Sequence, residues 1–86
     1  MTNEPTVDEV INIIRAVVDT GQEIRGHSIV KQIDGWDSMA MVNTVLFLEE
    51  RFNVEIDLPQ FAGSGSINDI VAVIEQSPTG AARVWP

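Results

Sequence analysis

The chain has 86 residues, which is enough for one domain with a modest core but short for an enzyme with a deep, preorganised pocket. Its 13 acidic and five basic side chains give a formal net charge of −8, which disfavours binding to nucleic acid or to an anionic membrane. The sequence has no cysteine, no secretory signal and no apolar run of the roughly 20 residues that span a bilayer, so we expect a cytoplasmic protein without a disulfide framework, a thiolate nucleophile or Cys-ligated zinc.

The first predicted helix covers about residues 7–19. Thr6 is a candidate N-cap, and Glu9, three residues later, is placed to complete a capping box. Gly21 is a candidate stop signal. The apolar residues recur at helical spacing and share one face: Val7, Val10, Ile11, Ile14, Val17 and Val18.

A long connection follows over residues 20–37. A loop of this length must be held against the rest of a small domain. We therefore expect its scattered apolar side chains to fold back onto the helices: Ile24, Ile29, Val30, Ile33 and Trp36. His27 is the only histidine and has no second ligand at a metal-binding spacing, so we predict a surface residue and no metal site.

The second helix is predicted over about residues 38–52, with Asp37 as the N-cap and Ser38 in the first turn near the surface. It carries two apolar stripes, which allows two interpretations. Either the helix is central and buried on several sides, or one stripe packs inward while the other faces a partner; the charged rim favours the second interpretation. The first stripe comprises Met41, Val45, Leu48 and Phe52 with Thr44 beside them; the second comprises Met39, Val42 and Leu46, rimmed by Asn43, Glu49 and Glu50; Ala40 and Phe47 point to a third side.

The rest of the chain predicts a short helix over about 57–62, opened by Asp57 and Pro59, and a fourth helix over about 67–76, capped by Ser66. Residues 77–86 lack periodicity and are predicted to form a mobile tail. No strand alternation persists. The sequence therefore predicts an all-α protein: a small antiparallel four-helix bundle over residues 1–76, with three main helices, one short helix and a long first loop.

Ser38 has no supporting catalytic group in the sequence. A nucleophile elbow needs glycine two residues before and after the serine, and here those positions hold Trp36 and Ala40. Nothing marks His27 as a general base. Ser38 is therefore better suited to modification by another enzyme than to acting as a nucleophile, and we do not expect the chain to be an enzyme.

The region around the second predicted helix resembles the acyl carrier protein family. The family's hallmark is Asp-Ser-Leu (or Met) at the start of this helix, followed by an apolar helix that ends in a Glu-Glu-x-Phe-like stretch. The resemblance covers roughly residues 6–76 in helix order and loop length, and is sharpest over 33–56. It is carried by Asp37-Ser38-Met39, Val42, Val45-Leu46, Leu48-Glu49-Glu50-Arg51-Phe52 and Val54-Glu55-Ile56.

The resemblance implies that Ser38 carries a 4′-phosphopantetheine arm, transferred from coenzyme A by a phosphopantetheinyl transferase, which makes the chain a phosphoprotein. The arm would supply a thiol that holds an acyl or aminoacyl group as a thioester. The resemblance also implies two further kinds of partner: a ligase or synthetase that loads the acyl or aminoacyl group, and ketosynthase, acyltransferase or condensation-type enzymes that receive it. The carrier itself is expected to be a monomer. Carried over by position, the partner surface comprises Asp37, Met39, Val42, Asn43, Leu46, Glu49 and Glu50, extended by Glu55 and Asp57.

The sequence departs from the usual fatty-acid carriers at three positions. Ala40 and Asn43 stand where those carriers usually have carboxylates, and Trp36 precedes the aspartate. The Gly-Trp-Asp-Ser run looks more like stand-alone carriers of specialised polyketide, nonribosomal-peptide or unusual-extender-unit pathways. Trp36 either pins the loop to the bundle or marks this subgroup. The main alternative to a carrier is an acidic helical adaptor that has the same fold but no prosthetic group.

Overall fold

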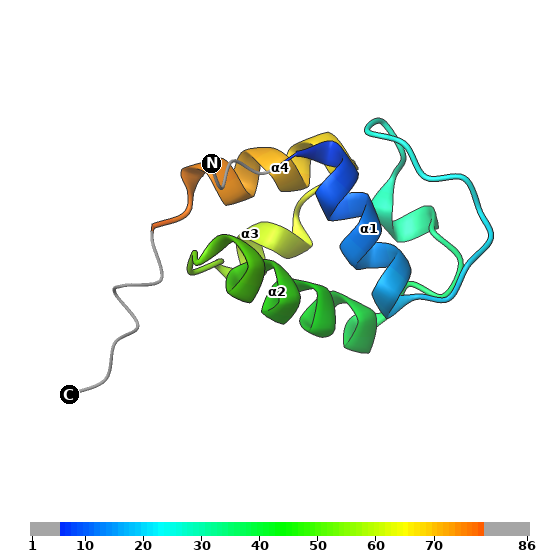
Figure 1. Cartoon of the computed structure of the whole chain (residues 1–86), viewed down its shortest axis with the longest axis horizontal. Helices are drawn as coiled ribbons and strands as arrows, with labels where there is room; N and C mark the ends of the chain where they lie inside the picture. Colours follow the sequence, from blue (N-terminus) through cyan, green and yellow to red (C-terminus); the bar gives the residue numbers. More distant parts are fainter. Residues whose placement is uncertain (1–5, 79–86) are drawn as a thin grey trace.

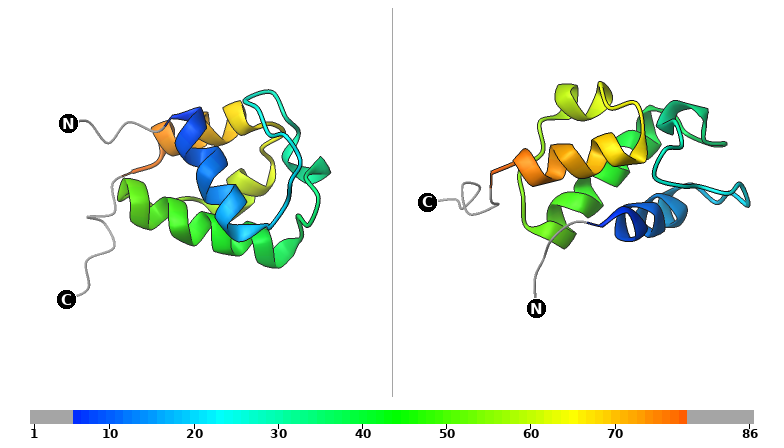
Figure 2. Two further views of the ribbon diagram at one scale, coloured as in Figure 1. Left: turned by 45° about the vertical axis from the view of Figure 1, so that its right-hand side comes forward. Right: turned by 90° about the horizontal axis from the view of Figure 1, so that it is seen from above.

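The computed structural model of the chain describes residues 6–78, which form four α-helices and one 3-10 turn. α2 and α4 run in the same general direction, whereas α1 crosses them obliquely on one side and α3 packs on the other side (Figures 1 and 2). The predicted all-α class, with three main helices, a short helix and a long first loop, is confirmed. The elements are α1 (Val7–Val17), η1 (Val30–Gln32, the 3-10 turn), α2 (Ser38–Phe52), α3 (Leu58–Ala62) and α4 (Ile67–Gln76).

The helix boundaries differ from the prediction only at α1 and α3. α1 ends at Val17, two residues early, because Val18 turns into extended backbone (φ −110°, ψ 122°) and places its side chain in the core. α3 begins at Leu58, and Asp57 occupies the N-cap position before it. Of the predicted tail, residues 79–86 lie outside the described part of the chain, and the Pro78 carbonyl accepts a hydrogen bond from the Glu55 N–H (2.9 Å).

The capping box predicted at α1 forms at α4 instead. Thr6 Oγ1 accepts a hydrogen bond from the Glu9 N–H (3.1 Å), but the Glu9 carboxylate pairs with Arg51 on α2 (2.9 Å) rather than closing the box. At α4, Ser66 Oγ accepts from the Asp69 N–H and Asp69 Oδ2 accepts from the Ser66 N–H. α4 therefore begins with both reciprocal bonds, whereas the corresponding acid of α1 serves a tertiary contact.

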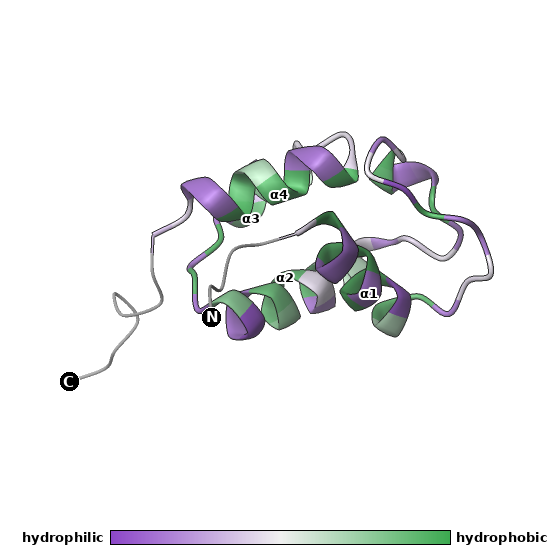
Figure 3. Ribbon diagram, turned by 45° about the horizontal axis from the view of Figure 1, so that its top comes forward, coloured by the Kyte–Doolittle hydropathy of each residue, from purple (hydrophilic) through white to green (hydrophobic). Residues whose placement is uncertain are grey.

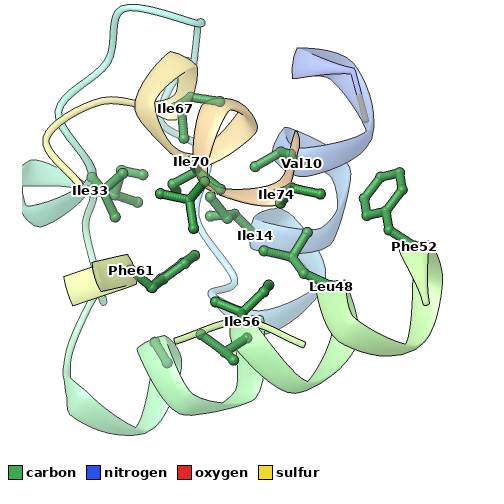
Figure 4. Close-up of a cluster of buried hydrophobic side chains, with 14 of the residues drawn as sticks. Val10, Ile14, Ile33, Leu48, Phe52, Ile56, Phe61, Ile67, Ile70 and Ile74 are labelled. Carbon is green, nitrogen blue, oxygen red and sulfur yellow. The ribbon is translucent and has the colours of Figure 1, made fainter. Parts of the chain in front are cut away.

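The core lies between the helices and takes residues from every one of them. Figure 4 shows isoleucine side chains of α1, of α4, of the long loop (Ile33) and of the segment after α2 (Ile56). They pack together with Leu48, Phe52 and Phe61. Hydrophilic and hydrophobic segments alternate along α2 and α4 because each helix turns one face to this core (Figure 3). Val10, Ile14, Leu48, Ile67 and Ile70 are fully buried.

The long loop after α1 is tied down as the sequence predicts, and backbone bonds to the start of α4 add to the apolar contacts. Ile24, Val30 and Ile33 are buried, whereas Ile29 stays 42% exposed. The N–H of Val30 donates to the Gly65 carbonyl (2.9 Å), and the N–H groups of Ile67 and Asn68 donate to the Ser28 and Gly26 carbonyls (3.2 and 2.9 Å). The loop is thus held against the N-terminus of α4 by backbone hydrogen bonds.

Candidate functional site around Ser38

Ser38 is the first residue of α2 and its side chain is exposed. Asp37 caps the helix from extended backbone, and its Oδ1 accepts a hydrogen bond from the Ala40 N–H (2.8 Å). A helix start carries free N–H groups and a partial positive charge. The hydroxyl of Ser38 is therefore presented to solvent at a position that tolerates an attached anion.

The turn before Ser38 is fixed by Gly35 and Trp36. Gly35 has φ +86°, a backbone conformation that residues with a side chain rarely adopt. A Cβ at this position would lie 3.6 Å from the Val18 side chain. The Trp36 N–H donates to the Ile33 carbonyl (3.0 Å), and its half-buried ring packs against the core. Trp36 therefore holds the end of the loop against the bundle, which is the first of the two interpretations of this residue.

The second apolar stripe of α2 faces solvent. Met39 is 70% exposed, Val42 39% and Leu46 55%. The interpretation of α2 as a helix buried on several sides is therefore wrong. The predicted third side of the helix, with Ala40 and Phe47, faces α1: Ala40 lies in the core beside the end of α1, whereas Phe47 is 52% exposed opposite the middle of α1. Since Ala40 is buried, this position contributes nothing to the outer surface of α2.

The polar residues predicted around this stripe divide into two groups. Asn43, Glu50, Glu55 and Asp57 are exposed. Glu49 is half-buried, and its Oε2 accepts a hydrogen bond from the Ile56 N–H (2.8 Å). The carboxylate of Glu49 thus holds the segment after α2 against the helix, a role that helical spacing alone does not reveal.

The fold can be compared with that of known proteins. No protein-family model and no curated protein matches the sequence. A solution NMR structure of a holo acyl carrier protein from Geobacter metallireducens superimposes with a TM-score of 0.69, over 92% of this chain and 88% of that chain, at 24% sequence identity. The fold is that of an acyl carrier protein.

Within this acyl carrier protein fold, the structure adds a groove beside Ser38 that the sequence did not predict. The groove has a volume of about 410 Å³ and runs between the end of α1 and the first turns of α2. Asp19, Asp34 and Asp37 line it together with Met39 and Asn43. The sequence does not predict that Asp19 and Asp34 lie close together, because they are 15 positions apart and only the folded loop brings them to the same groove.

Two other kinds of site are missing from residues 6–78. No three side chains of histidine, aspartate or glutamate come together so as to hold a metal ion there. None of the helices in this range combines the length and apolar character needed to span a bilayer.

Proposed function

We propose that the protein is an acyl carrier protein that bears 4′-phosphopantetheine on Ser38 and carries acyl or aminoacyl groups as thioesters between biosynthetic enzymes. The observation that carries this proposal is the exposed hydroxyl of Ser38 at the capped N-terminus of α2, in a fold shared with a holo acyl carrier protein. The protein would act as a carrier and not as an enzyme, since the chemistry belongs to its partners.

The residues around Ser38 suit a phosphate ester. Asp37 Oδ1 accepts from the N–H of Ala40, the third residue of the helix, and this bond does not involve the N–H groups of Ser38 and Met39, which point to where an attached anion would lie. Ser38 is exposed, and the neighbouring Met39 side chain is 70% exposed. The bound group would supply the thiol that the cysteine-free chain lacks.

Attachment would form a bond between Ser38 Oγ and the pantetheine-side phosphorus of coenzyme A. The bond from that phosphorus to the adenosine bisphosphate part would break, and the hydroxyl proton would pass to a base of the transferase. Within residues 6–78, the neighbouring carboxylate of Asp37 is engaged as the helix cap, through Oδ1 and the Ala40 N–H.

The decisive experiment is mass spectrometry after co-expression with a promiscuous phosphopantetheinyl transferase. We expect wild-type protein to gain one phosphopantetheine mass and Ser38→Ala to gain none. Ser66→Ala is the matched control, since Ser66 also opens a helix but is half-buried and bonded within a capping box. An unmodified wild type, or a mass gain that survives Ser38→Ala, would contradict the proposal.

The exposed stripe of Met39, Val42 and Leu46, with Glu50 at its edge, is proposed as the surface that meets the transferase, the loading ligase or synthetase and the ketosynthase, acyltransferase or condensation-type enzymes. Apolar side chains give such a surface area to bury, and carboxylates give it a field that attracts basic partners. The Gly-Trp-Asp-Ser run supports a specialised polyketide or nonribosomal-peptide type pathway.

The same stripe also suits an acidic adaptor without an arm, which is the second candidate function. An adaptor needs the exposed apolar residues of α2 but makes no use of the Ser38 hydroxyl. The mass measurement therefore separates the two candidates.

A further inference from the structure

One groove on the described residues lies towards the opposite end of α2 from Ser38. It is a groove of about 510 Å³ between α1 and the C-terminal half of α2. Ile13, Ala16 and Phe47 give it an apolar lining, and Asn12, Glu50 and Arg51 are its polar members. We propose that the C-terminal segment of this chain, residues 81–86, occupies the groove, with Trp85 on the apolar lining and Arg83 beside Glu50.

The apolar lining of the groove includes a large exposed aromatic ring. Phe47 is 52% exposed although it faces α1 across the groove, so a large aromatic surface remains in contact with water. A second aromatic ring placed against it would bury about 150–250 Å² of its own surface and gain the geometry-specific attraction of an aromatic pair. The groove therefore suits an aromatic residue.

The segment outside the described residues has this composition. Residues 79–86 read Thr-Gly-Ala-Ala-Arg-Val-Trp-Pro, with a single aromatic residue and no acidic one. Its connection to the described chain is also well placed. The Pro78 carbonyl is bonded to the N–H of Glu55, three residues beyond the end of α2 (2.9 Å), and Figure 1 shows the end of α4 beside the C-terminal end of α2.

The reach of the segment is sufficient. Trp85 lies seven residues beyond Pro78, a span of about 23 Å when extended. The groove includes Glu50 and Arg51, in the last turn of α2, so the segment has to pass roughly one helix diameter of about 10–12 Å. An occupant tethered this closely competes at a high effective concentration against any separate protein.

Charge complementarity supports the same occupant. Arg51 is engaged by Glu9 (2.9 Å) and stacks over the Phe52 ring (5.2 Å to the centroid), so it does not serve Glu50. In residues 6–78 the two ion pairs are those of Arg51 with Glu9 and Arg25 with Glu23, which leaves Glu50 without an ionic partner there. Arg83 is the basic residue that the segment brings to it.

The test is paramagnetic relaxation in the full chain, which has no cysteine and therefore accepts one specific spin label. With the label on Asn12→Cys at the groove, we expect the indole N–H signal of Trp85 to lose its intensity. Adding Phe47→Ala should restore the signal, whereas Leu46→Ala should not. Leu46 is the matched control because it precedes Phe47, is similarly exposed (55% against 52%) and lies outside the groove.

The folding of each variant is checked by the Trp36 indole signal, which should stay in place because both truncated side chains are largely exposed. A Trp85 signal that keeps its intensity beside the label would overturn the proposal, as would equal responses to Phe47→Ala and Leu46→Ala. Signal loss that grows with protein concentration would assign the groove to a second copy of the chain and would also overturn it.

Discussion

At the scale of single residues, two neighbouring carboxylates of α2 have different environments. Glu49 accepts a hydrogen bond from the Ile56 N–H (2.8 Å) and is half-buried, whereas Glu50 is exposed. The difference follows from position on the helix, since the chain folds back after Asn53, which adopts the left-handed conformation (φ 53°). The proposed docking surface is therefore better tested at Glu50 than at Glu49, because a change at Glu49 would also disturb the end of α2.

We predict that Glu50→Lys slows modification of Ser38 by the transferase several-fold, mainly by lowering the association rate. The reason is that a rim carboxylate contributes long-range attraction to a basic partner. The measurement is the initial rate at several salt concentrations, and the defect should shrink as ionic strength rises. Glu75→Lys on α4, which makes the same charge change at another exposed position, should keep the wild-type rate. Equal rates for both variants would remove Glu50 from the proposed surface.

At the scale of the element, α4 shows how a helix start can respond to acid. The N–H groups of Ser66 and Gly65 both donate to Asp69 Oδ2 (3.0 and 3.1 Å), and these bonds lower the pKa of Asp69 below its ordinary value of 3.8. The folded chain thus holds this carboxylate ionised more strongly than the unfolded chain does. Its contribution to stability is complete above the unfolded pKa and is lost as the pH falls through the lower, folded value.

We therefore predict that the urea midpoint of the wild type falls more steeply than that of Asp69→Asn as the pH is lowered through and below 3.8, the ordinary pKa of the aspartate. The asparagine cannot ionise, so it removes this source of pH dependence. Asp57→Asn is the control, because Asp57 occupies the N-cap position of α3 without a side-chain capping bond and should retain the wild-type slope. Parallel curves for wild type and Asp69→Asn would refute the assignment.

The helices themselves were predictable because each is specified locally. Periodic apolar residues and capping side chains lie within a few positions of one another, so α2 and α4 have the predicted bounds. Tertiary contacts account for what was missed: Val18 ends α1 early to enter the core, and Glu9 leaves its own cap for Arg51. Of the site, Asp37, Ser38 and the exposed stripe were predictable, but the buried Ala40 and the groove between Asp19 and Asp34 were not.

At the scale of the whole molecule, the backbone bonds that join the long loop to the start of α4 have a consequence for dynamics. The N–H groups of Val30, Ile67 and Asn68 can exchange with solvent only when the loop separates from α4, because their acceptors lie across that junction. We predict that the three amides exchange with one common opening free energy in native-state hydrogen exchange. Widely different values for the three would show that they open independently.

Such a cooperative unit would include the turn before Ser38, because the Trp36 N–H is bonded to the carbonyl of Ile33, a buried residue of the same loop. Ser38 would then stand at the boundary between a segment that opens as one piece and a helix that remains closed. Partial unfolding of this protein would open the groove beside Ser38 while leaving α2 intact. The loop side of the groove would therefore unfold more often than the side formed by α2.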